Sequence, residues 1–92
     1  MRSVEKVPGG KLVCIEAEVQ EGKTTIVKIT GDFFLHPEDA IDGLERSLLD
    51  LKAGSSESEI SEKIKESLAR SGALLIGASP EDLARIFKRA MG

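Results

Sequence analysis

The chain has 92 residues, of which 40% are hydrophobic and 32% charged, and its formal net charge at pH 7 is -3. This length predicts one small domain over 1–92, and the acidic balance gives no basic footprint for nucleic acid. A single cysteine excludes an internal disulfide, no apolar run approaches the ~20 residues that span a bilayer, and the charged first residues do not resemble a signal peptide, so we expect a cytoplasmic protein.

The first ten residues show no sustained periodicity and end in Pro8-Gly9-Gly10, which interrupts regular structure. We therefore expect 1–10 to be a flexible arm or a turn that leads into a strand. Lys6 and Lys11 flank the glycines, so backbone N–H and ammonium groups could together approach a phosphate or a carboxylate. The GxxxxGK[ST] spacing of a P-loop is missing, and both a plain turn and an anion site remain open.

Residues 11–35 carry the pattern of a small antiparallel sheet. Apolar and polar residues alternate over 11–19, which predicts a half-buried strand. Gly22 suits a hairpin connection, and the β-branched residues of 24–30 predict the returning strand. Because a two-stranded sheet is marginal in water, we expect a third strand over 32–35.

A corner that holds two of the three phenylalanines lies between the strands and the first expected helix. Gly31 and Asp32 suit a strand end or a bulge. Phe33 and Phe34 are adjacent, so on an extended segment one ring can enter the core while the other faces a partner. His36 is the only histidine, and beside a proline it is typical of a capping or surface residue.

The remaining residues, 37–92, predict about three helices. Apolar residues at spacings of three and four mark a helix over 38–52, and Gly43 inside it suggests close packing against the sheet. A capping box over 55–59 begins a second helix, and a serine followed by proline at 79–80 begins a third.

The apolar run 73–77 between the last two helices is too short to classify by its period, and we expect a buried connector there. The order of strands first and helices second predicts an α+β fold, in which a small antiparallel sheet packs against the helices.

Nothing in the chain assembles a catalytic constellation. Cys14 is the one candidate nucleophile, but a mid-strand thiol with no positive neighbour in the sequence is usually an inert small hydrophobe. A triad of Cys14, His36 and Asp32 can be written down, although no spacing supports it. One histidine provides no histidine pair for zinc, so we expect no metal site and no catalysis by the chain alone.

Two segments, KVPGGKLV at 6–13 and ITGDFFLHP at 29–37, resemble the small C-terminal domain of lipoate-protein ligases, as do Gly22, Ile41 and the Leu-Glu pair at 44–45. In some archaea and bacteria that domain is a separate protein, the accessory subunit of a two-part ligase. The order of elements extends the resemblance over nearly the whole chain. It implies a fold similar to that of iron-sulfur scaffold and sulfur-acceptor proteins.

The resemblance also implies a function. In that family the large catalytic subunit binds lipoate and ATP, forms lipoyl-adenylate with Mg²⁺, and passes the lipoyl group to a lysine of an acceptor domain. The small domain is a non-catalytic accessory subunit that is needed for the activation step and caps or remodels the active site. The implied partner of this chain is therefore the catalytic subunit, in a heterodimer, and ATP, Mg²⁺ and lipoate act only in the complex.

Two sets of candidate site residues follow from the matched segments. The glycine-rich segment is expected to close the adenylate site through positioning and positive charge, and comprises Lys6, Gly9, Gly10 and Lys11. The corner is expected to pack on the large subunit, and comprises Asp32, Phe33, Phe34 and His36. The alternative is that both segments only shape the turn and the core of the small domain.

Two hypotheses from other classes remain open. The implied fold suggests a sulfur acceptor or an iron-sulfur scaffold that uses Cys14, although a scaffold requires several cysteines and an acceptor requires an exposed thiol. The other hypothesis is a protein-binding module with an unrelated partner.

Overall fold

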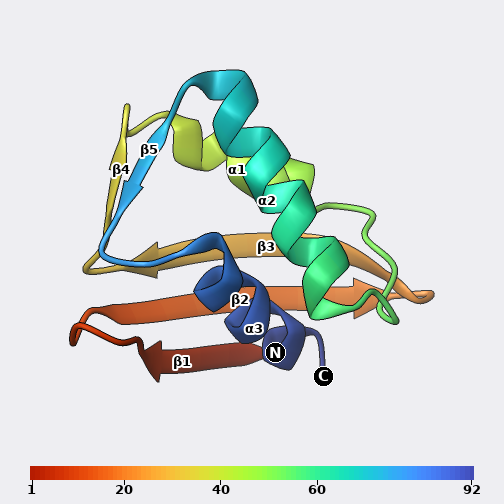
Figure 1. Cartoon of the computed structure of the whole chain (residues 1–92). Helices are drawn as coiled ribbons and strands as arrows, with labels where there is room; N and C mark the ends of the chain where they lie inside the picture. Colours follow the sequence, from red (N-terminus) through yellow and green to blue (C-terminus); the bar gives the residue numbers. More distant parts are fainter.

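Five strands and three helices follow one another in the computed structural model, which describes all 92 residues (Figure 1). The expected α+β class is confirmed. No helix combines the length and the apolar character that a membrane crossing requires. In chain order the elements are β1 (Arg2–Lys6), β2 (Leu12–Gln20), β3 (Lys23–Gly31), β4 (Phe34–His36), α1 (Ala40–Ser47), α2 (Glu57–Ser71), β5 (Leu74–Ile76) and α3 (Pro80–Met91).

The first three strands form one antiparallel sheet in the order β1-β2-β3. The expected hairpin is present as β2 and β3, and of the alternating apolar residues of β2, Val13, Ile15 and Ala17 are buried and Val19 is partly buried. The expectation of a flexible arm or turn over 1–10 is wrong for Arg2–Lys6, which pairs with β2 along its whole length. This strand carries little periodicity in its sequence because it lies at an edge and none of its residues is fully buried.

The third strand expected over 32–35 does not join this sheet. The chain turns away after Gly31, and β4 instead pairs with β5 in a separate two-stranded antiparallel sheet. The run 73–77 is therefore a short strand with two exposed residues, and the expectation of a buried connector was wrong. Residues 32–35 and 73–77 are far apart in the sequence, so no pattern of neighbouring residues could predict that they pair.

Helix α1 is shorter than the helix expected over 38–52. It ends at Ser47 because the next turn is held by Thr24 of β3, whose buried hydroxyl donates to the Leu48 carbonyl (2.6 Å) and accepts from the Leu51 N–H (3.0 Å). Gly43 does not mark close packing, since a Cβ at that position would meet nothing within 4 Å.

The starts of the other two helices agree with the sequence. Ser56 and Glu59 form a complete capping box at the start of α2, and Ser79 and Asp82 form another at the start of α3. Gly72 closes α2 in the left-handed conformation.

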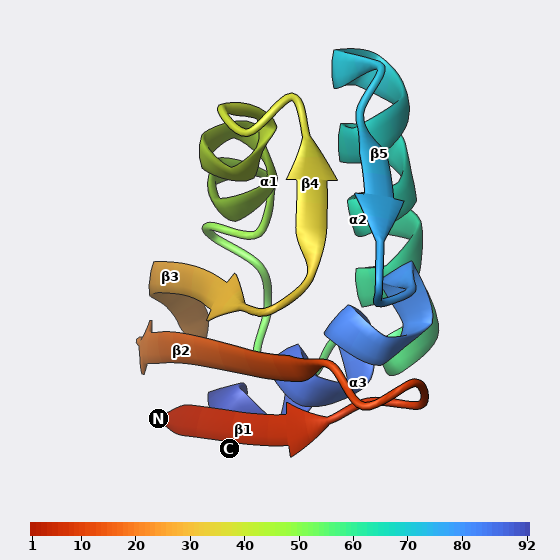
Figure 2. The same ribbon diagram turned by 90° about the vertical axis from the view of Figure 1, so that its left-hand side faces the viewer.

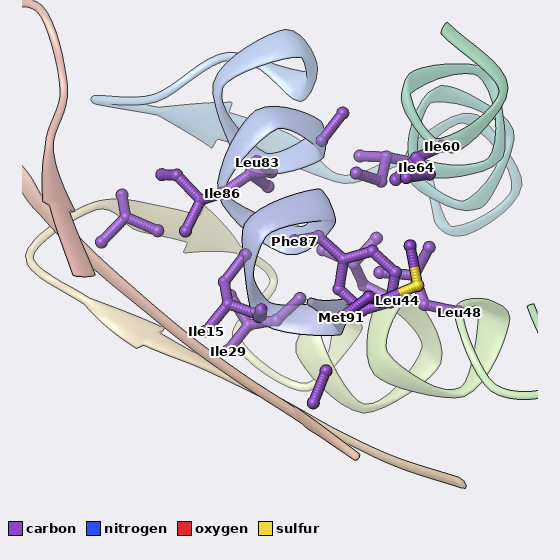
Figure 3. Packing of buried hydrophobic residues seen from close by; sticks show 14 of the residues in the cluster. Ile15, Ile29, Leu44, Leu48, Ile60, Ile64, Leu83, Ile86, Phe87 and Met91 are labelled. Carbon is purple, nitrogen blue, oxygen red and sulfur yellow. The ribbon is translucent and has the colours of Figure 1, made fainter. Parts of the chain in front are cut away.

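Helix α3 packs against β1 and β2 of the sheet and against α2, and it carries the centre of the core. Phe87 is fully buried, and it points with Met91 toward Leu44 and Leu48 of α1 (Figure 3). Ile15 lies on the side of α3 that faces the sheet (Figure 3). Helix α1 also contacts β3 directly, and the core includes residues of all three helices and of β2 and β3.

Candidate functional site

The glycine-rich segment is the turn between β1 and β2. The Gly10 N–H donates to the Val7 carbonyl (2.9 Å), and the Val7 N–H donates to the Lys11 carbonyl (2.8 Å). Gly9 and Gly10 have φ of 99° and 84°, values that side-chain-bearing residues rarely adopt. Proline followed by glycine at the centre of the turn is the usual composition of a type II turn. The backbone conformation of the turn alone therefore explains why both positions are occupied by glycine.

The corner after β3 contacts this turn and the first residue of β2 that follows it. The Asp32 N–H donates to the Leu12 carbonyl (2.8 Å), and a Cβ on Gly31 would lie only 2.3 Å from the same oxygen. The ammonium nitrogen of Lys11 lies 5.9 Å from the centroid of the Phe34 ring, within the range of a cation–π contact. The two segments singled out in the sequence therefore meet in the structure.

The β4-β5 pair presents an apolar face to solvent beside this junction. Phe34 is 64% exposed and lies opposite Ile76, which is 50% exposed; His36 lies opposite Leu74, which is 59% exposed. Figure 2 shows the two strands side by side in front of α1 and α2, above the turn between β1 and β2. We call the four residues Phe34, His36, Leu74 and Ile76 the ribbon face.

The predicted site residues are divided between this surface and the core. Phe33 points the other way from Phe34 and packs against the core cluster, so the two rings separate as adjacent strand residues should. Asp32, Lys6 and both turn glycines are exposed, and neither Lys6 nor Lys11 takes part in an ion pair within the chain.

Sequence reasoning missed Leu74 and Ile76. The only signal was the alternation inside the apolar run 73–77, which is too short to distinguish a strand from a buried connector. Only the pairing with β4 places these two side chains on the same face as Phe34.

Cys14 lies on the outer, uncovered face of the sheet and is half-buried. The Nε of Arg2 on the neighbouring strand approaches its sulfur at 3.2 Å, so the thiol has a positive neighbour that its sequence surroundings did not indicate. No hydrogen bond joins Cys14 to His36 or Asp32, and the triad that can be written from the sequence is not assembled.

The hollows of the molecule lie elsewhere and are open. The largest, about 750 Å³, is lined by polar residues at the far end of the β2-β3 hairpin, and one of about 440 Å³ lies between β3 and α1. Neither includes the ribbon face or the glycine turn. No group of three or more histidine, cysteine or carboxylate side chains is gathered to hold a metal ion. The candidate site is therefore a surface and not a pocket.

An ion-pair cluster holds the edge strand that leads into the glycine turn. The carboxylate of Glu5 accepts from Arg85 Nε (3.1 Å) and from Arg89 (2.7 Å) of α3. The hydrogen bonds from Arg85 hold the pKa of Glu5 below its ordinary value. Arg85 also binds Asp82 (2.9 Å), so the charges on both elements are compensated. β1 is thereby fixed against α3 close to the turn.

No family model and no curated protein matches the chain. Among solved structures, the chain is similar to one from a structural analysis of an archaeal lipoylation system, which comprises a bi-partite lipoate protein ligase and its E2 lipoyl domain from Thermoplasma acidophilum. The two chains are 27% identical, the similarity covers 100% of this chain and 98% of the other, and the TM-score is 0.66. The similarity thus extends over nearly all of both chains.

Proposed function

We propose that this chain is the accessory subunit of a two-part lipoate-protein ligase and is required when the catalytic subunit activates lipoate with ATP. The observation that carries the proposal is the similarity, over nearly all of both chains, to a component of a lipoylation system whose ligase is bipartite. The resemblance of 6–13 and 29–37 to the small ligase domain supports the same assignment. Its place of action would be the cytoplasm.

The shape of the chain favours the accessory role over the catalytic role. An adenylating site must enclose both the lipoate chain and ATP so that water is kept from the reactive acyl group. The hollows of this chain are open to solvent and lined mainly by polar residues. The glycine turn and the corner with Phe34, which contact each other, form a surface and not an enclosed site. A partner that supplies the enclosed site fits this arrangement.

The contribution to activation would be electrostatic. In that step a carboxylate oxygen of lipoate attacks the α-phosphorus of ATP and displaces pyrophosphate, which leaves lipoyl-adenylate. Both reactants are anionic, so a cation brought to the site when the subunit closes would lower the repulsion between them. Lys6 and Lys11 flank the exposed glycine turn and have no carboxylate partner in this chain, and Mg²⁺ would be bound with ATP in the partner.

A second candidate function is that of the lipoyl acceptor. Lys23 is exposed at the tip of the β2-β3 hairpin, directly after Gly22, and an acceptor lysine must project in this way to enter an active site. In the transfer step its amine would attack the acyl carbon and release AMP. The resemblance to the ligase domain does not support this role, but the experiment below distinguishes it.

The test is a reconstitution with the catalytic subunit from the same organism, ATP, Mg²⁺, lipoate and an acceptor domain. We expect the acceptor to be lipoylated only when this chain is present, while the mass of this chain stays unchanged. A mass increase of one lipoyl group on Lys23 would establish the acceptor role instead. Equal lipoylation of the acceptor with and without this chain, together with an unchanged mass of this chain, would contradict both roles and favour a module with an unrelated partner.

A further inference from the structure

The ribbon face gathers three exposed apolar side chains on two short paired strands. Phe34, Leu74 and Ile76 are each at least half exposed. If each fully exposed side chain presents about 150–250 Å², the three together expose roughly 300 Å². A patch of this size on a small monomer is often functional. A partner that covered the face would remove the apolar surface of all three side chains from water, which favours association.

The two strands also carry unused backbone groups. β4 and β5 pair only with each other, and neither forms a backbone hydrogen bond to any other segment. An isolated two-stranded sheet is marginal in water, and its open edges can accept a further strand. The ribbon therefore has both an apolar surface and backbone edges that a partner could complete.

The size of the face argues against a second copy of this chain as the partner. Two ribbon faces packed together would bury roughly 600 Å² in total, whereas stable specific interfaces bury about 1,200–2,000 Å². The face must therefore form part of a wider contact. The glycine turn is the neighbouring surface, since Lys11 is in contact with Phe34 and the stem of the same lysine lies 3.2 Å from where a Cβ on Gly77, next to Ile76, would be.

The charges at the rim indicate the chemistry of the partner surface. Lys6 and Lys11 are the cations nearest the turn, and neither is compensated within a chain whose net charge is -3. A partner with an apolar patch beside carboxylates or phosphates would match both parts of this surface. A catalytic subunit that holds lipoate and ATP next to its binding surface meets that requirement.

We infer that the ribbon face is the surface by which this chain docks onto the catalytic subunit of the ligase, with Phe34, Leu74 and Ile76 as the anchors and the glycine turn at its edge. The inference rests on the proposed function. It assigns Leu74 and Ile76 to the interface and leaves Phe33 to the core. Docking in this way would bring Lys11 to the boundary between the two subunits.

The experiment measures binding of the purified catalytic subunit to the full-length chain by calorimetry. The chain offers a matched pair of substitutions, because Ile76 on the ribbon face and Ile26 on β3 are strand isoleucines that are 50% and 53% exposed. We expect Ile76→Lys to weaken binding at least about thirtyfold, as loss of an interface anchor does. Ile26→Lys should change it less than twofold. Leu74→Ser provides a second test of the same face, and circular dichroism verifies that each variant is folded.

The outcomes separate the two proposals. If the wild type binds the catalytic subunit and the Ile76→Lys and Leu74→Ser variants bind it equally strongly, the docking surface is wrong. That outcome would leave the accessory function standing. No binding by the wild type would overturn the accessory function together with the inference. Sedimentation should show a monomer, and a dimer that Ile76→Lys dissolves would assign the face to a second copy instead.

Discussion

Lys11 at the end of the glycine turn holds its ammonium nitrogen 5.9 Å from the centroid of the Phe34 ring at the start of β4. This contact joins the two segments that resemble the small ligase domain, although Lys11 and Phe34 are 23 positions apart in the sequence. It places a cation beside the most exposed aromatic side chain of the protein. The turn and the ribbon face thus form one continuous surface.

Removal of the Lys11 charge should slow activation of lipoate. Lys11→Met keeps the apolar stem that packs near Gly77 but removes the cation, so we expect lipoyl-adenylate formation to fall at least about tenfold. Pyrophosphate release in the presence of the catalytic subunit measures this rate. Lys28→Met on the outer face of β3 is the matched control and should leave it unchanged. An unaffected rate in Lys11→Met would assign this lysine to the fold alone.

The two glycines Gly31 and Gly43 should respond to alanine in opposite directions. At Gly31, φ is 152° and a Cβ would overlap the Leu12 carbonyl, so Gly31→Ala should lower the free energy of unfolding by about 2 kcal/mol or more. Gly43 lies inside α1 with open space around its Cα, so Gly43→Ala should raise it by about 0.5–1 kcal/mol. Urea unfolding of the two variants measures both effects, and a loss of stability in Gly43→Ala would contradict this description of α1.

Thr24 should be the most important polar residue of the core. Thr24→Val keeps the shape of the side chain but leaves the Leu48 carbonyl and the Leu51 N–H without their partner, which we expect to cost about 2 kcal/mol. Thr25→Val on the exposed face should stay within about 0.5 kcal/mol of the wild type. Thermal unfolding provides the comparison, and equal midpoints for the two variants would show that the turn after α1 is held by other contacts.

Stability should depend on the Glu5 carboxylate at acidic pH. Hydrogen bonds from Arg85 lower the pKa of Glu5 in the folded chain below its ordinary value of 4.5. Below pH 4.5 the unfolded chain therefore binds a proton at this residue more readily than the folded chain does. The contribution is therefore complete above pH 4.5 and is lost as the pH falls through the lower, folded pKa. We expect Glu5→Gln to cost about 1 kcal/mol at neutral pH and progressively less as the pH falls below 4.5.

The control for this pH dependence is Glu66→Gln on the exposed side of α2, where the carboxylate forms no ion pair. Its unfolding free energy should follow that of the wild type at every pH. If Glu5→Gln and the wild type differ by the same amount at pH 7 and pH 3, the pairing with Arg85 does not stabilise the charged form.

Local patterns predicted the elements whose cause is local. The alternation of β2, the capping box that begins α2, and the serine and proline that begin α3 were all read from neighbouring residues. The errors concern contacts between distant segments: the pairing of β1 with β2, the pairing of β4 with β5, and the end of α1 at a turn held by Thr24. A three-residue strand has too few positions to show a period, so only its partner defines it.

The candidate site could be predicted only in part for the same reason. The resemblance selected the turn and the corner, and the opposed directions of Phe33 and Phe34 followed from strand geometry. Leu74 and Ile76 could not be included, because their side of the ribbon depends on its register with β4. Arg2 beside Cys14 was missed because cross-strand neighbours are invisible before the strands are paired.

The most direct measurement separates the two half-reactions of the catalytic subunit. Formation of lipoyl-adenylate from lipoate and ATP is followed with and without this chain, and transfer from preformed lipoyl-adenylate to an acceptor domain is followed in the same way. An accessory subunit for activation should be required in the first assay and dispensable in the second. Adenylate formation at the same rate in its absence would contradict the proposed function.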